Sequence, residues 1–162
     1  MRLVIGVGNP DRGDDAVGLA VARRVRDAAP GDVTVAELDG DQLKLLDAWD
    51  GADEVYVVDA VCSGGRPGAT YRFDTSGPLG ARFGHRGTHT FSLAEVIELA
   101  RALRRLPARL AGYGIEGATF ALGAGLSPAA EAAAGAVAGQ ILDELTGGGP
   151  GSGPSATSRP WS

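Results

Sequence analysis

Short runs rich in β-branched residues alternate along the chain with patterns of helical period. Strands are predicted over residues 3–7, 33–38, 55–58 and 70–73, with a further strand over 118–122 or over the neighbouring 109–115. This alternation is typical of βαβ units. It predicts an α/β fold in which a mainly parallel sheet is covered by helices on both faces.

Four helices are expected between and after these strands. Apolar positions 17, 21 and 25 form one stripe, and residues 41–49 form a second, short helix. Positions 93, 96, 97, 100 and 103 repeat at helical spacing behind Ser92-x-x-Glu95, a capping-box pattern that places His89 just before the helix. The last helix should begin at Ser127-Pro128, because serine is a favourable N-cap and proline suits the first turn.

The length of the chain, 162 residues, is that of one domain. Residues 147–162 consist largely of glycine, proline and serine and contain little that can be buried. Such a composition is typical of disordered segments. We therefore predict a single α/β domain over residues 1–146 and a disordered tail over 147–162.

Charge and cysteine content disfavour several classes of function. The chain carries 20 acidic and 15 basic residues, a net charge of -5, which disfavours binding to nucleic acid or to an anionic membrane. Cys62 has no second cysteine with which to pair, as expected in a reducing cytoplasm. The first residues do not have the pattern of a signal peptide, and no apolar run approaches the ~20 residues that span a bilayer. We expect a soluble, cytoplasmic protein.

The first predicted strand leads into a glycine-containing turn, residues 6–15, that ends in two adjacent carboxylates, Asp14 and Asp15. A phosphate-binding turn presents backbone N–H groups at this position, where negative charge would repel the ligand. The two carboxylates suit a cation or an attacking water better. Asp14 is also a good helix N-cap, and Asp15 could act through the helix dipole alone.

Another carboxylate, Asp59, is expected to face the same turn. If the strand order begins 2-1-3, a ligand crevice lies between the carboxyl ends of the first and third strands. Asp59 ends the third strand, where a buried carboxylate needs a partner to offset its desolvation. Alternatively, Asp59 could cap a turn with Ser63.

Both histidines, His85 and His89, lie in one segment before the third helix, and His89 is the nearer to that helix. Asp15, Asp59 and one imidazole would offer oxygen and nitrogen ligands to a divalent transition metal, with positions left open for water. Such a metal would polarise a carbonyl group and lower the pKa of bound water toward ~7. The sequence contains no His-Glu-x-x-His pair, Cys-x-x-Cys pair or lysine-bearing phosphate loop.

The motifs along residues 1–145 resemble those of the hydrogenase maturation proteases, endopeptidases that trim the large subunit of nickel-iron hydrogenases. The first motif is Leu-Val-Ile-Gly-Val-Gly-Asn-Pro-(x)3-Asp-Asp-Ala-Val-Gly at residues 3–18. Further motifs follow in the family's order at residues 37–40, 57–60, 88–96 and 123–128.

This resemblance implies a three-layer fold with a twisted, mainly parallel sheet between helices. It also implies that Asp15, Asp59 and His89 are the catalytic, metal-contacting residues, with Asn9, Asp39 and Gly40 as supporting, substrate-binding residues. The substrate would be the large-subunit precursor, whose C-terminal extension is removed after nickel insertion. The nickel is presented by the substrate, so no permanently bound cofactor is expected.

Two positions depart from the family's pattern. Asp15 is shorter by one methylene group than the glutamate that many members have there. After Asp39-Gly40 the family often has a second glycine and a Gly/Thr-rich turn thought to meet the substrate, whereas this chain continues with Asp41-Gln42-Leu43.

Three other functions compete with a protease. A dinucleotide-binding turn would require glycine at Asp11, and Pro10 lacks the backbone donor. Cys62 could be a nucleophile, but a lone cysteine after a strand is more often a small buried apolar group. The chain could also be a non-catalytic protein that recognises a hydrogenase subunit or a metal.

Overall fold

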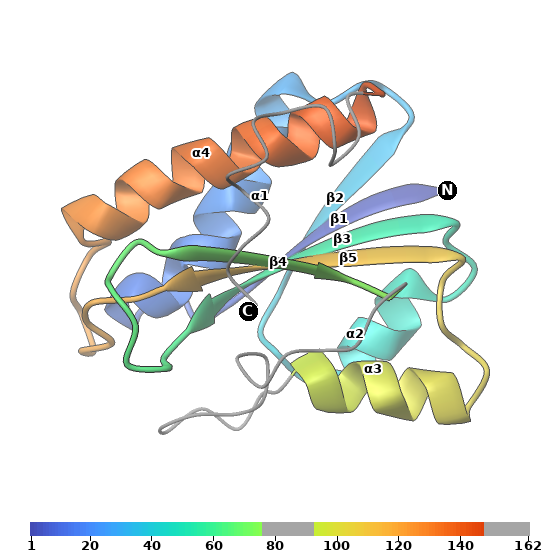
Figure 1. The fold of residues 1–162 in the computed structure, drawn as a ribbon, viewed down its shortest axis with the longest axis horizontal. Coiled ribbons are helices and arrows are strands. Elements are labelled where there is room, and N and C mark those ends of the chain that lie inside the picture. The colour runs from blue at the N-terminus through green and yellow to red at the C-terminus, as the bar shows by residue number, and fades with distance from the viewer. Residues whose placement is uncertain (76–92, 148–162) are drawn as a thin grey trace.

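The structure, a computed structural model, describes residues 1–75 and 93–147. These residues form one five-stranded sheet with the strand order β2-β1-β3-β5-β4 (Figure 1). All neighbouring strands are parallel except β4 and β5, which are antiparallel. The strands are β1 Arg2–Val7, β2 Val33–Leu38, β3 Glu54–Val61, β4 Thr70–Asp74 and β5 Arg109–Glu116.

Helices cover both faces of this sheet (Figure 1). A short 3-10 turn, η1 (Gly13–Ala16), leads into α1 (Val17–Ala28), which packs with α4 (Pro128–Leu145) on one face. On the other face lie α2 (Gln42–Trp49) and α3 (Leu93–Ala102). Each face buries its own apolar cluster, so the predicted three-layer α/β fold is confirmed.

The strand predictions hold for the first four strands, whereas the alternatives for the fifth are now resolved. The strand is β5 at 109–116, and residues 118–122 belong to the β5–α4 loop, residues 117–127. The third strand is also longer than predicted. Beyond the Gly6–Val58 pair with β1, β3 continues to pair with β5 through Val61. Asp59 therefore lies within β3 and does not end it.

Side chains cap α2 and α4, and the cap of α4 is the predicted one. The Asp41 carboxylate caps α2 by accepting from the N–H groups of Leu43 at 2.9 Å and Lys44 at 3.2 Å. The Ser127 hydroxyl caps α4 by accepting from the Ala130 N–H at 3.2 Å. Ser92 of the predicted capping box of α3 lies outside the described residues, as do residues 148–162 of the predicted tail 147–162.

Asp14 does not cap α1, contrary to the prediction. It lies inside η1 rather than before it, so its side chain does not reach the first N–H groups of α1, whose N-cap is Ala16. The buried carboxylate turns instead to the β5–α4 loop. It accepts from the N–H of Ala118, and from both the N–H and the hydroxyl of Ser127, each at 2.7 Å.

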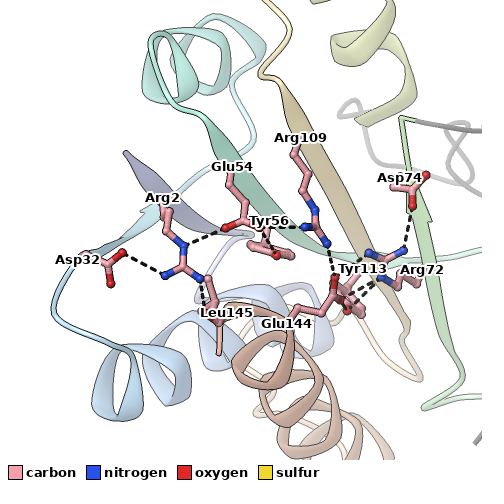
Figure 2. A network of polar contacts seen from close by, with 10 residues as sticks. All are labelled: Arg2, Asp32, Glu54, Tyr56, Arg72, Asp74, Arg109, Tyr113, Glu144 and Leu145. Atoms are coloured by element: carbon pink, nitrogen blue, oxygen red, sulfur yellow. Dashed lines mark hydrogen bonds and ion pairs between the residues drawn. The ribbon is translucent and has the colours of Figure 1, made fainter. Parts of the chain in front are cut away.

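A polar network fixes the opposite end of the sheet to the last turn of α4 (Figure 2). The Glu144 side chain is only 4% exposed and accepts from Arg72 at 2.7 and 3.0 Å and from the Tyr113 hydroxyl. A carboxylate near a helix C-terminus is opposed by the helix dipole, so these donors are needed to hold it there. Arg72 thereby joins the edge strand β4 to α4.

We predict that Glu144→Ala lowers the free energy of unfolding by about 3 kcal/mol, because it leaves the largely buried Arg72 guanidinium without its main partner. Denaturant unfolding measures the change. The matched control is Glu131→Ala on the same helix, where the carboxylate pairs with Arg24 but is 53% exposed. This control should lose less than about 1 kcal/mol. Equal losses in the two variants would contradict a structural role for the network.

We further predict that Asp14→Ala lowers the free energy of unfolding by about 3 kcal/mol, because several donors of the β5–α4 loop lose the buried carboxylate that accepts from them. The exposed Asp11→Ala is the control and should change stability by less than about 0.5 kcal/mol. Urea unfolding of both variants tests the difference.

The pH dependence of the Asp14 variant supplies a second check. Burial alone would raise the pKa of Asp14, but hydrogen bonds from Ser127, Ala118 and Thr119 outweigh it and lower the pKa. The stabilisation is therefore complete above the ordinary carboxyl pKa of about 3.9 and is lost as the pH falls through the lowered value. A difference between wild type and Asp14→Ala that grows as the pH falls would contradict this account.

Candidate functional site

The candidate site lies where the carboxyl ends of β1 and β3 adjoin the start of α1. The observed order begins 2-1-3, the arrangement for which the sequence analysis expected a ligand crevice at this point of the sheet. Gly18 lets α1 begin there, since a Cβ atom at this residue would lie 2.4 Å from the carbonyl oxygens of both Val7 and Val58. The start of α1 therefore packs closely against both strands. Asp15 lies in η1, directly before this helix.

Asp15 is buried in η1 and is oriented by the turn that precedes it. Its Oδ2 atom accepts from the N–H of Asn9 at 3.0 Å. The Asn9 side chain faces the other way, with its Oδ1 atom accepting from the Asp11 N–H at 2.9 Å. Asn9 therefore supports Asp15 through its backbone and stabilises the turn through its side chain.

Asp59 extends from β3 on the side of the sheet covered by α2 and α3. Side chains alternate along a strand, and its neighbours at 57 and 61 belong to the apolar cluster of that face. The residue opposite Asp59 on β5 is Gly114, which has no side chain to fill the space. The Oδ1 atom accepts from the N–H of Ala60 at 2.8 Å.

Electrostatics links the two carboxylates. Burial raises the pKa of Asp59 well above its ordinary range, and the charge of Asp15 raises it further. Two close carboxylates resist ionising together, and they are relieved either by a shared proton or by a bound cation. The charge of Asp15 therefore acts on Asp59, and the assignment of both residues to a catalytic, metal-contacting site stays a prediction.

The predicted third member, His89, lies outside the described residues, as does His85. The helix that follows them, α3, lies on the Asp59 face, where Leu93 and Val96 join the same apolar cluster as Val57. It starts toward the carboxyl ends of the parallel strands (Figure 1). Within residues 1–75 and 93–147, no three His, Cys, Asp or Glu side chains are arranged to hold a metal ion.

The turn between β2 and α2 contains the predicted substrate-binding residues Asp39 and Gly40. The Asp39 carboxylate accepts from Lys44 Nζ at 3.0 Å and from the Asp41 N–H at 3.1 Å, and the bond from Lys44 is the main cause that lowers the pKa of Asp39. Gly40 has φ +96°, a conformation that favours glycine. Asp41, the departure from the family pattern, caps α2.

Glu116 is a buried carboxylate at the same edge of the sheet that the sequence analysis missed. It accepts from the Ser63 N–H at 2.8 Å, from the Ser63 hydroxyl at 2.5 Å and from the Tyr71 hydroxyl at 3.1 Å. Ser63 therefore bonds to Glu116, which differs from the suggested turn with Asp59. The signal was present, since Glu116 ends an apolar strand, which is where the sequence analysis expected Asp59 to lie.

None of the helices within the described residues is both long enough and apolar enough to cross a membrane. Cys62, considered above as a nucleophile, is a free cysteine that follows β3 and is only partly buried.

Comparisons with known proteins agree with this architecture. A structure of the hydrogenase maturating endopeptidase HybD from Escherichia coli has a TM-score of 0.75 and 27% identity, covering 92% of this chain and 94% of that chain. A solution structure of an endopeptidase from E. coli has a TM-score of 0.79 and 25% identity over the same shares. The structure of HycI, a [NiFe] hydrogenase maturation protease from Thermococcus kodakarensis, has a TM-score of 0.67 and 27% identity, covering 90% of this chain and 92% of that chain.

A search of curated proteins gives no match. The model of the HycI hydrogenase maturation protease family matches residues 19–144, well over half of the sequence. The matched residues include the later motifs at residues 37–40, 57–60, 88–96 and 123–128. The chain belongs to the hydrogenase maturation protease family.

Proposed function

We propose that this protein removes the C-terminal extension of a nickel-iron hydrogenase large-subunit precursor after nickel has been inserted. The observation that supports this most directly is the placement of Asp15 in the β1–α1 connection and of Asp59 on β3, the two strands that flank the topological switch point of the sheet. Family membership supports the endopeptidase activity. The nickel ion belongs to the substrate in this proposal, so the enzyme requires no metal of its own.

In the proposed reaction, Asp15, Asp59 and His89 contact the nickel of the precursor. Carboxylate oxygen and imidazole nitrogen are suitable ligands for such an ion. The cation would offset the repulsion between the two carboxylates and thereby lower the raised pKa of Asp59. Recognition of the loaded precursor would follow, because only the loaded form supplies this charge.

The hydrolytic step begins when a water, activated by a carboxylate or associated with the nickel, attacks the scissile carbonyl carbon. The base takes one proton from the water as the C–O bond forms. Collapse of the tetrahedral intermediate breaks the C–N bond, and the departing amine receives a proton. The products are the mature subunit with a new C-terminal carboxylate and the released peptide.

We predict that wild-type protein shortens a nickel-loaded large-subunit precursor by a C-terminal peptide and that Asp15→Asn slows this cleavage by at least about 100-fold. Mass spectrometry of the precursor over time measures both. Asp53→Asn is the matched control, since the Asp53 side chain, just before β3, is 80% exposed. This variant should cleave the precursor as fast as wild type does. An unchanged precursor mass, with wild type and Asp15→Asn indistinguishable, would refute the protease function. Binding without cleavage would favour a non-catalytic recognition protein.

We also predict that Asp15→Asn lowers the pKa of Asp59 without returning it to about 3.9. The variant removes the repulsion from Asp15 but leaves burial, which is the larger cause of the raised pKa. Carboxyl-carbon NMR titration of the protein without precursor measures the pKa, with Asp53→Asn as the control. A pKa of Asp59 that does not respond to Asp15→Asn would show that the two side chains do not interact.

The raised pKa of Asp59 also makes the stability of the fold depend on pH. Because the pKa of Asp59 is raised in the folded state, its protonated form stabilises the fold at low pH, and this contribution is lost as the pH rises through the folded value. Asp59→Asn should therefore be more stable than wild type at neutral pH. Denaturant unfolding at several pH values tests the sign of this difference.

A further inference from the structure

The β5–α4 loop, residues 117–127, combines features that are unusual for a surface loop of this protein. Charged residues make up 22% of the whole chain, yet none occurs in these residues. Leu122 in the middle of the loop is 71% exposed, more than any other large apolar residue in the described part of the chain. The loop therefore presents an apolar side chain to solvent without neighbouring charges of its own.

The loop is also held in one conformation by the turn that carries Asp15. Besides the bonds to the Asp14 carboxylate, the N–H of Gly123 donates to the Asp11 carbonyl at 2.7 Å and the N–H of Gly13 to the Ala124 carbonyl at 3.1 Å. The N–H of Asp14 in turn donates to the Thr119 carbonyl at 2.8 Å. Figure 1 shows the loop, gold to orange, beside the blue turn that precedes α1.

Two glycines allow the loop to adopt this conformation. Gly117 is needed because a Cβ atom there would lie 2.6 Å from Cζ of Phe120 and 3.0 Å from Cβ of Asp14. Gly123 adopts φ +84°, which favours glycine. A loop fixed before binding loses little conformational entropy when a partner covers it, so a held, apolar and exposed loop suits recognition of a protein.

We infer that the β5–α4 loop is a docking surface for an apolar segment of the precursor, with Leu122 as its central contact. The inference rests on the proposed function and extends it from the scissile bond to the surrounding protein. The position and the composition of the loop indicate which part of the precursor contacts it. The loop is continuous with the turn of Asp15, so a protein whose tail reaches the carboxylate pair also meets Leu122. Because residues 117–127 offer no charge, the contacting segment is apolar.

The test compares Leu122→Asp with Leu103→Asp in cleavage of the nickel-loaded precursor. Leu103 is also exposed, at 51%, but it follows α3 toward the amino end of β5 and lies away from the carboxyl edge. Leu122→Asp should raise KM at least tenfold and change kcat less than twofold, because the loop contacts the substrate outside the reacting groups. Leu103→Asp should match wild type in both constants.

A milder variant keeps the test decisive if Leu122→Asp disturbs folding. Leu122→Ala removes apolar contact without adding charge, so it should raise KM by a smaller factor than the aspartate variant. Circular dichroism and the unfolding midpoint establish that each variant is folded. If wild type cleaves and both Leu122 variants keep its KM, the docking surface is refuted while the protease function stands.

Two other outcomes would also overturn the inference. If wild type neither binds nor cleaves the precursor, the proposed function fails and the docking surface fails with it. If light scattering shows that wild type is a dimer and that Leu122→Asp makes it monomeric, the loop instead contacts a second copy of this chain. A monomeric wild type with the expected change in KM supports the docking surface.

Discussion

The hydrogen bonds of the Asp14 carboxylate are the constraint on which the functional edge of this protein depends. One buried side chain holds the first βα turn, the β5–α4 loop and the N-cap of α4 together. Its partners follow it by more than 100 residues in the sequence. A carboxylate is well suited to this role because several donors can share its two oxygen atoms, and each bond is strengthened by its charge. Without it, three elements would meet with unpaired backbone donors.

The placement of Asp14 also explains why its neighbour is available for chemistry. Adjacent residues in a tight helical turn point in different directions, so Asp14 bonds to the β5–α4 loop while Asp15 accepts from the N–H of Asn9. One aspartate has a lowered pKa and a structural role. The other lies beside Asp59 and raises the pKa of that carboxyl. The two adjacent identical residues therefore have different partners: Asp14 bonds to the β5–α4 loop, and Asp15 bonds to the backbone of the turn that precedes it.

Much of the fold was predictable because it depends on local patterns. The period of apolar residues predicted the helices, Asp41 and Ser127 are their caps, and a parallel order beginning 2-1-3 was enough to bring Asp15 near Asp59. The role of Asp14 was not predictable, since a good N-cap residue was free to bond to a distant loop instead. The choice between 109–116 and 118–122 for the fifth strand likewise depended on pairing with β3, which no local pattern records.

The two ends of the sheet differ in the signs of the charges that lie near one another. At the amino end and along α4, charges of opposite sign meet: Arg2 pairs with Glu54, and Arg72 and Arg109 surround Glu144 (Figure 2). At the carboxyl end, two like charges approach each other, and the burial of Asp59 adds to the cost of ionising both. Such a pair destabilises the empty protein unless a proton or a cation is present. Stabilising ion pairs elsewhere allow the fold to tolerate this local conflict, and under the proposed function the nickel of the precursor would relieve it.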